Sequence, residues 1–338
     1  MPRNIVYSMV KNCCNCRQIY AQEYSIDFLF NSTNLRFSAI PPMPTVAQVP
    51  LLFMINAAQR LPVDRDPGLA KVHHKGPNGL ISPWHDIPLY VSEMTKTFNM
   101  IVEIPRWTNA KLEIATNEPL NPIKQDEKDN APRFVKNVFP YKGYIWNYGA
   151  LPQTWEDPEH KDEHTEASGD NDPVDIVEIG QKIQPCGAVV PVKVLGAIAM
   201  LDEGQTDWKV VSIHINDPLA PKLNDIQDLE THLPGLLTAT VEWFRDYKIP
   251  DGKAANTFAF NAEFKDRAFA LNVIEQTHQF WKKLISEQSP KLNTECHVDG
   301  AAHPVDDAKW KSIVEEKPTT DSAQSIPESV DHWHFIKK

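Results

Sequence analysis

Short apolar runs separated by polar turns occupy the middle of the chain. These runs predict strands over residues 100–104, 110–114, 133–139, 144–148, 173–179, 189–200 and 208–215. Five or more short strands with polar residues in the loops between them are typical of a small closed barrel rather than a parallel sheet. We therefore expect a closed five-stranded barrel core.

Helical periodicity appears only after these strands. Leu237, Val241, Phe244 and Lys248 form one stripe, and a second stripe lies within residues 263–288. Strands followed by helices indicate an α+β fold with helices flanking the barrel. We expect three parts: an N-terminal extension over 1–80, poorly ordered or a transit segment; a main domain over 81–288; and a tail over 289–338 that packs back on the domain.

Net charge argues against one class of partner. The chain carries 34 Lys and Arg against 45 Asp and Glu, a net charge of −11, of which the first 60 residues contribute +3 and the remainder −14. A nucleic-acid binder normally presents a basic face to the phosphates. We expect no nucleic-acid partner. A surplus of carboxylates suits a protein that binds divalent cations.

The N-terminal region leaves two interpretations open. Residues 38–59 carry no charge, but four prolines interrupt them, so we expect no membrane helix. A basic leader with few acids suits either an organelle transit peptide or an unstructured extension. Cys13, Cys14 and Cys16 lie in this leader, and only Cys13 and Cys16 have metal-compatible spacing. With five cysteines in all, a reducing compartment is the simpler interpretation.

Three aspartates crowd the segment Gly-Asp-Asn-Asp-Pro-Val-Asp-Ile at residues 169–176. Asp170 and Asp172 point to the same side of an extended backbone, and Asp175 follows on a strand. Such carboxylates repel one another, and a bound cation removes the conflict. The alternative is a solvated acidic turn. A helix–loop–helix calcium site is excluded because its glycine, its glutamate and its flanking helices are missing.

A second acidic pair lies between two predicted strands. If residues 203–206 form a four-residue hairpin loop with Gly204 left-handed, Asp202 and Asp207 face each other. Like charges at such a position destabilise a sheet unless a cation lies between them. Lys209 shares the face of Asp207. A charged, solvent-exposed hairpin tip is the alternative interpretation.

Cationic and phenolic side chains accompany these acids. Together with the acidic residues Glu103 and Glu113, the set consists of Lys111, Arg133, Tyr144, Tyr148, Tyr247 and Lys248. Carboxylates with Mg²⁺, lysine and arginine are what phosphoryl transfer requires, because the enzyme mainly positions and neutralises charge. Taken singly, each of these residues is more often a surface charge or a packed tyrosine.

Taken together, five stretches resemble the family I soluble inorganic pyrophosphatases of the eukaryotic type. They are residues 98–111, 141–149, 169–175, 202–209 and 243–252, within a resemblance that runs from about residue 81 to 285. The resemblance implies an oligonucleotide-binding-like (OB-like) barrel of five strands and hydrolysis of diphosphate with Mg²⁺, for which Mn²⁺ could substitute. Residues 81–288 would then be the catalytic domain.

The resemblance also implies a role for each site residue. Asp170, Asp175 and Asp207 would bind the first Mg²⁺, Asp175 also a second, and Asp202 with Asp207 a further one, with Glu113 helping through water. Asp172 would be the general base beside the metal-activated water. Lys111, Tyr148 and Lys209 would hold the phosphoryl group under attack, and Arg133, Tyr247 and Lys248 the leaving phosphate. Tyr144 and Glu103 would line the site.

Partners and compartment follow from the same resemblance. Arg106 and Trp107 resemble the contact residues of a homodimer, and a cytoplasmic location is expected, or a mitochondrial one if the leader is a transit peptide. The sequence departs from the family pattern at Gln205 and at Ala254-Ala255. An alternative to the enzyme is a non-catalytic or dual-role subunit of a larger complex, for example in chromatin, built on the same fold.

Overall fold

The structure is a computed structural model that describes residues 59–60, 71–315 and 326–337. Backbone proximity divides the chain into two units, Met1–Ala47 and Gln48–Lys338. All of the described residues belong to the second unit, and the cysteines of the leader lie outside them. No helix in the described ranges is both long and apolar enough to cross a membrane.

Strands outnumber helices among the described residues. The strands are β1 Gln59–Arg60, β2 His74–Gly76, β3 Gly79–Ile81, β4 Tyr90–Ser92, β5 Thr97–Ile104, β6 Leu112–Ile114, β7 Ile123–Gln125, β8 Glu127–Lys128, β9 Ala131–Pro132, β10 Asn137–Val138, β11 Asn147–Ala150, β12 Asp175–Glu178, β13 Val189–Asp202, β14 Gln205–His214, β15 Thr257–Phe258 and β16 Trp333–His334. The helices are α2 Asp228–His232, α3 Leu236–Asp246, α4 Arg267–Ser286, α5 Asp307–Glu315 and α6 Glu328–Asp331, with short 3-10 turns η2 Ala220–Lys222, η3 Ile249–Asp251 and η4 Ala259–Ala262.

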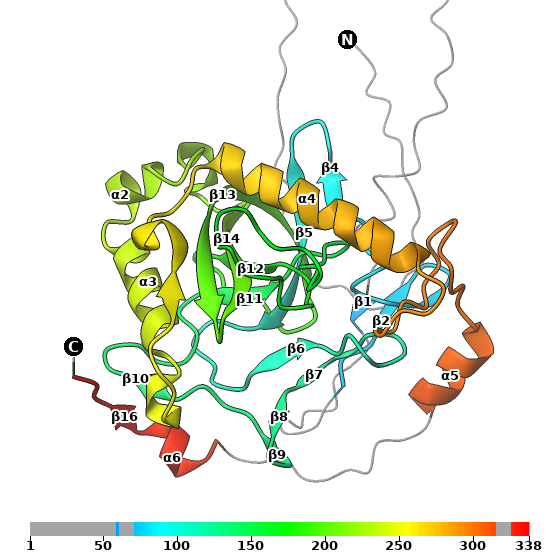
Figure 1. Cartoon of the computed structure of the whole chain (residues 1–338), viewed down its shortest axis with the longest axis horizontal. Coiled ribbons are helices and arrows are strands. Elements are labelled where there is room, and N and C mark those ends of the chain that lie inside the picture. Colours follow the sequence, from blue (N-terminus) through cyan, green and yellow to red (C-terminus); the bar gives the residue numbers. More distant parts are fainter. Residues whose placement is uncertain (1–58, 61–70, 316–325, 338) are drawn as a thin grey trace, which may run out of the picture. The chain divides into compact units, whose positions relative to one another are not determined.

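The main sheet has seven strands in the order β15-β13-β14-β12-β11-β5-β4 (Figure 1). A further pairing joins β13 to β5, so the pairings run from β13 through β14, β12, β11 and β5 back to β13. Within this circuit β12 and β14 are parallel, and the other neighbours are antiparallel. The sheet thereby brings the ends of β11, β12, β13 and β14 to one place.

The long strand β13 makes the circuit possible. Its 14 residues pair with β5 over Val189–Lys193 and with β14 over Val192–Asp202. The register shifts between Val194 and Gly196, and a bulge of this kind bends a strand. A Cβ on Gly196 would lie 2.4 Å from the Lys265 carbonyl oxygen, so the close approach of the two backbones requires glycine.

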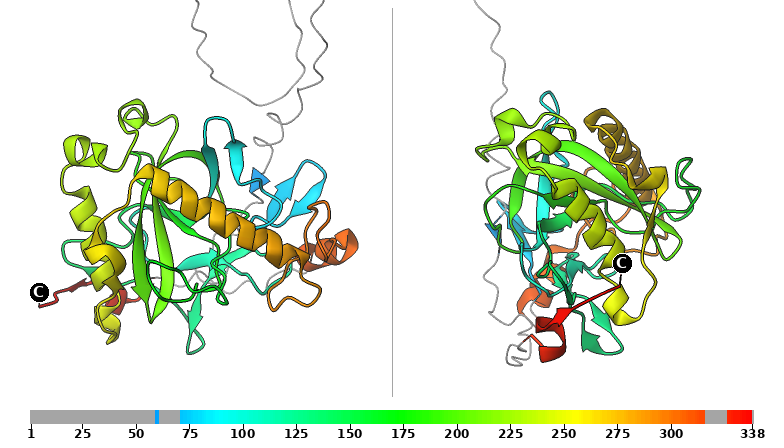
Figure 2. Two further views of the ribbon diagram at one scale, coloured as in Figure 1. Left: turned by 45° about the horizontal axis from the view of Figure 1, so that its top comes forward. Right: turned by 90° about the vertical axis from the view of Figure 1, so that its left-hand side faces the viewer.

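Two helices cover the strands of this circuit (Figure 2). Helix α4 packs along β13 through Ala270 and Ile274, and the Asp266 side chain caps its first turn by accepting from the Phe269 amide. Helix α3 supplies Phe244, whose ring stacks on Trp146 with centroids 4.8 Å apart. Buried aromatic pairs of this kind add to the hydrophobic stabilisation of a core.

Most of the elements predicted from the sequence are present. Strands β5, β6, β12, β13 and β14 and helices α3 and α4 lie where the patterns place them, and the α+β class is confirmed. The predicted strand over 133–139 is wrong, because only Asn137–Val138 is a strand. The backbone amides of Arg133, Val135 and Phe139 donate to carbonyls on three separate segments, so no continuous ladder forms.

The predicted four-residue hairpin loop is also wrong. Asp202 pairs with Gln205, so the turn contains only Glu203 and Gly204, with φ of 49° and 89°. Two positive φ angles are typical of the type I′ turn, whose twist matches the strands that it joins. Asp207 therefore pairs with Met200, and Asp202 is its diagonal neighbour rather than its direct partner.

Candidate active site

The predicted site residues meet in one cleft of about 860 Å³. Its lining includes Glu103, Lys111, Glu113, Arg133, Tyr148, Asp170, Asp172, Asp175, Asp202, Asp207, Lys209, Tyr247 and Lys248. Tyr144 is the exception, because it is buried behind the lining, with its ring 5.2 Å from that of Tyr148. The ends of β11, β12, β13 and β14 supply much of the cleft floor.

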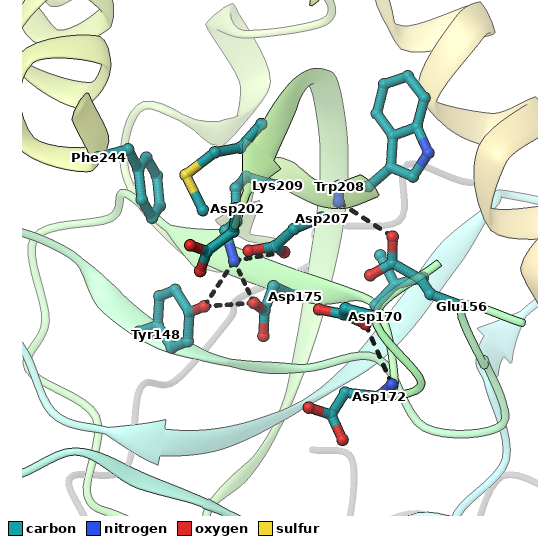
Figure 3. Close-up of polar contacts among 12 residues, drawn as sticks. Tyr148, Glu156, Asp170, Asp172, Asp175, Asp202, Asp207, Trp208, Lys209 and Phe244 are labelled. Carbon is teal, nitrogen blue, oxygen red and sulfur yellow. Dashed lines mark hydrogen bonds and ion pairs between the residues drawn. The ribbon is translucent and has the colours of Figure 1, made fainter. Parts of the chain in front are cut away.

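Lys209 is the central cation of the cleft floor (Figure 3). The strand register places it beside Asp175, and Asp207 lies two residues before it on the same face of β14. Its ammonium group donates to the Asp175 carboxylate, to Asp207 Oδ1 at 2.5 Å and to the Tyr148 oxygen at 3.0 Å. Burial alone would lower the pKa of Lys209, but Asp175 and Asp207 raise it well above its ordinary value.

The loop before β12 presents Asp170 and Asp172 to the cleft. The Asp172 amide donates to Asp170 Oδ1 at 3.1 Å, and two backbone hydrogen bonds join this loop to Glu156. A Cβ on Gly169 would lie 2.4 Å from the Glu156 carbonyl oxygen, so only glycine allows this approach. The sequence Gly-Asp-Asn-Asp thus folds as a loop that is tightly bound to residue 156.

Glu156 is a site residue that the sequence patterns did not indicate. Its Oε1 accepts from the Trp208 amide at 3.0 Å, while its buried Oε2 has no hydrogen-bond partner in the described part of the chain. One carboxylate oxygen each from Glu156, Asp170 and Asp207 lie within 4.8 Å of one another. Three hard oxygen donors with an unsatisfied buried atom fit a divalent cation such as Mg²⁺.

Crowding perturbs the acids of this group. Burial, together with Asp172 and Asp175, raises the pKa of Asp170 to about 8. Burial also raises the pKa of Glu156 and of Asp207 well above the usual range, and neighbouring carboxylates add to both shifts. Glu103 behaves in the same way: burial and then Asp175 raise its pKa, although its Oε1 accepts from the Ile114 amide at 2.7 Å.

Asp172 occupies a more open position than the other acids. Its side chain is exposed at the cleft, yet the enclosing walls, with Glu113 and Asp175, raise its pKa to about 7. Asp172 is therefore the most accessible carboxyl group of the acidic loop before β12.

Lys111 and Arg133 form a cationic pair on the opposite wall. Asp126 joins them, because its Oδ2 accepts from Lys111 Nζ at 3.2 Å and from an Arg133 guanidinium nitrogen at 2.9 Å. Lys111 also donates to Glu113 at 2.5 Å. No sequence pattern singles out Asp126, because Glu127 and Asp129 stand in the same polar stretch.

The remaining predicted cation and phenol come from the end of α3. Tyr247 stacks on Trp243 with ring centroids 4.9 Å apart, and Lys248 Nζ donates to both oxygens of Asp202 at 2.5 and 2.6 Å. The hairpin carboxylate therefore has a lysine partner across the cleft.

The two predicted dimer residues lie outside the cleft. Arg106 donates to the Gly180 carbonyl at 2.6 Å, and Trp107 is 54 % exposed. Trp107 has a φ of 65°, which is rare for a bulky residue, and its amide donates to the Tyr144 carbonyl. The strained backbone holds a large apolar ring in solvent.

Crowded oxygen donors facing lysine, arginine and tyrosine groups define a class of protein. This arrangement suits a metal-dependent hydrolase that acts on a phosphate anhydride or ester. The chain belongs to the inorganic pyrophosphatase family, whose model matches residues 100–282.

Curated relatives agree with this family. The chain is 57 % identical to inorganic pyrophosphatase 1 of Caenorhabditis elegans over 79 % of this chain, and it spans 62 % of that protein's length. It is 53 % identical to the inorganic pyrophosphatase of Bos taurus over 76 % of this chain and 90 % of that protein. The solved inorganic pyrophosphatase of Schistosoma japonicum is 47 % identical, with a TM-score of 0.76 over 82 % of this chain and 100 % of that chain.

Proposed function

We propose that this protein is an inorganic diphosphatase that hydrolyses diphosphate to two phosphates with Mg²⁺. The observation that carries the proposal is the cleft itself. It gathers carboxylates from the loop before β12 and from β12, β13 and β14, and it surrounds them with Lys111, Arg133 and Lys248. Membership of the inorganic pyrophosphatase family supports the same substrate.

The oxygen ligands for the metal would come from Asp170, Asp175, Asp202 and Asp207, with Glu113 and Glu156 close by. A bound Mg²⁺ would supply charge neutralisation and a water of lowered pKa. Carboxylate oxygens suit both Mg²⁺ and Mn²⁺, so the donor set does not distinguish these metals. We propose Mg²⁺, for which Mn²⁺ could substitute.

The protein's own groups account for the rest of the reaction. Asp172 takes a proton from the attacking water while the oxygen of that water bonds to phosphorus and the bridging P–O bond breaks. Lys111, Tyr148 and Lys209 hold the phosphoryl group under attack. The leaving phosphate takes the bridging oxygen with its electron pair, and Arg133, Tyr247 and Lys248 stabilise the resulting charge.

Phosphate release from diphosphate tests the function directly. The wild-type protein should release phosphate with Mg²⁺ and stop when EDTA is added. Asp172→Ala should lower kcat about 10²- to 10⁴-fold, which is the usual contribution of a general base. Asp299→Ala, which removes an exposed carboxylate from a distant turn, is the matched control and should be unchanged. Normal turnover by Asp172→Ala would remove that residue from its role.

We also infer a homodimer that uses Arg106 and Trp107. The exposed Trp107 ring supports this, because large apolar groups are enriched in interfaces. Sedimentation of the wild-type protein and of Trp107→Glu tests it: the variant should be monomeric at concentrations where the wild type is a dimer. A wild-type monomer would contradict the inference.

Architecture and compartment complete the proposal. The circuit of pairings supports the closed OB-like barrel. We propose that the chain consists of an N-terminal extension over 1–80, a catalytic domain over 81–288 and a C-terminal tail over 289–338. The burial of Val72 and His74 favours a start of the catalytic domain slightly before residue 81. We propose a cytoplasmic location, with a mitochondrial one if the leader is cleaved. N-terminal sequencing of native protein would distinguish the two, because an intact Met1 or Pro2 terminus refutes cleavage.

A further inference from the structure

The C-terminal segment, residues 326–337, forms one wall of the cleft. Pro327, Ser329 and Val330 belong to the cleft lining, and Val330 is buried. Just beyond them, β16 pairs in parallel with β10, so the end of the described chain lies beside its middle (Figure 1). None of the predicted catalytic or metal-binding residues lies in this segment.

Asn137 on β10 connects this wall to the rest of the site. It is almost fully buried, and its side-chain amide donates to the Asp331 carbonyl at 3.0 Å. Its oxygen accepts from Asn109 Nδ2 at 2.7 Å and from the Gly143 amide at 2.9 Å. A buried amide with three partners on three segments fixes those segments relative to one another.

The bonds continue from Asn137 to the substrate cations. The Asn109 side-chain amide donates to the Val135 carbonyl at 2.8 Å, and the Asn109 backbone carbonyl accepts from the Val135 amide at 2.7 Å. One step further, the Lys111 amide donates to the Arg133 carbonyl at 3.1 Å. The backbone of both cations therefore belongs to a short ladder, residues 109–111 against 133–135, and Asn137 fixes one end of it.

We propose that Asn137 is a positioning residue for diphosphate hydrolysis, which ties the C-terminal wall to the ladder of Lys111 and Arg133 and so holds Arg133 toward the leaving phosphate. This inference rests on the proposed function. The Asn137 side chain is not in the cleft lining, so its effect on the reaction passes through Arg133. Without its side chain, the backbone pairing of β10 with β16 and the bond from Arg133 to Asp126 remain, but the hydrogen bonds from Asn137 to Asn109, Gly143 and Asp331 are lost, so the guanidinium is positioned less precisely.

Steady-state kinetics of the full-length protein test this effect. Asn137→Ala should lower kcat/KM for diphosphate about 10- to 100-fold, the cost of a small misplacement of a binding group. Asp331→Ala is the matched control. It keeps the backbone carbonyl that accepts from Asn137 and removes only a carboxylate 3.5 Å from Lys142, both exposed, so its kinetics should not change.

A double-mutant cycle separates positioning from a merely structural role. In an Arg133→Ala background, Asn137→Ala should change kcat/KM less than about twofold, because its effect passes through Arg133. If Asn137→Ala lowers kcat/KM by the same factor in the Arg133→Ala background as in the wild type, the proposal is overturned. A lower Tm of Asn137→Ala with unchanged kinetics would overturn it as well.

A second variant and the wild type complete the test. Asn137→Asp keeps both accepted hydrogen bonds but replaces the donor to the Asp331 carbonyl by a buried carboxylate oxygen that repels it, and it should show the same coupling to Arg133. All rates are measured well below the Tm of each variant, so loss of fold does not imitate loss of position. An inactive wild type would refute the proposed function, whereas an active wild type with independent Asn137 and Arg133 effects refutes this inference alone.

Discussion

Replacing Lys209 by methionine should destabilise the metal-free protein strongly. Methionine fills a similar volume but removes the buried ammonium group that contacts Asp175, Asp207 and Tyr148. Removing one partner of a buried ion pair leaves uncompensated charge and costs about 3–5 kcal/mol. The Tm measured in EDTA should therefore fall on the order of 10 °C.

Mg²⁺ should reverse much of this loss, because a divalent cation among the carboxylates replaces the missing positive charge. At about 100 times its Kd, a ligand stabilises the native state by about 2.7 kcal/mol. Thermal unfolding in EDTA and in Mg²⁺ measures both effects. The expected result is a larger stabilisation by Mg²⁺ in Lys209→Met than in the wild type.

A lysine at the cleft rim provides the matched control. Lys253 pairs with Glu203 at 2.9 Å, but both side chains are largely exposed. Exposed pairs contribute about 0–1 kcal/mol, so Lys253→Met should barely change the Tm. The reasoning fails if Lys209→Met behaves like Lys253→Met in EDTA, or if its loss is the same with and without Mg²⁺.

Three further outcomes are expected. The neutral His85 ring accepts a hydrogen bond from Trp281, and burial lowers the pKa of His85 to about 4. As pH falls from 6.5 to 4, His85 is therefore protonated in the unfolded chain before the folded one, and the free energy of unfolding drops by up to about 3 kcal/mol. Urea titrations should show a shallower pH dependence of this free energy for His85→Gln than for the wild type, and equal slopes would contradict the reasoning. Gly169→Ala should lower activity more than about tenfold, since a Cβ would lie 2.4 Å from the Glu156 carbonyl oxygen; unchanged kcat/KM would show that the loop adapts. Glu156→Gln should raise the Tm in EDTA, because it removes a buried acid whose ionisation is opposed by burial and by neighbouring carboxylates, yet it should raise the Mg²⁺ concentration needed for half-maximal activity. An unchanged Mg²⁺ requirement would exclude Glu156 as a ligand.

The sequence predicted which residues gather in the cleft better than it predicted the connections of the fold. Asp170, Asp175 and Lys209 could be found because strand alternation and dense charge leave a pattern along the chain. Glu156 and Asp126 could not, since each stands beside other acids and only the fold brings it to its partners at the site. Glu156 is followed directly by Asp157, and residues 151–155 mix polar and apolar side chains, so no local pattern marks Glu156 as a site residue.

Backbone conformation explains the main errors. A positive φ at Glu203 is unusual for a residue other than glycine, so the shorter hairpin turn was not evident from Gly204 alone. The stretch 133–139 reads as a strand by composition, but its hydrogen-bond partners are set by tertiary contacts with residues 109, 126 and 334. Local propensity cannot report partners of this kind.

The circuit of pairings through β13, β14, β12, β11 and β5 has a consequence for amide hydrogen exchange. Asp175, Asp202 and Asp207 belong to strands of this circuit, so no one of them can swing away while its neighbours keep their hydrogen bonds. Slow exchange at these positions should therefore report opening of the whole sheet, whereas the amides of the loop that carries Asp170 and Asp172 can exchange through local opening. Loss and recapture of a cation would then involve that loop, and the rest of the protein would keep its protection throughout.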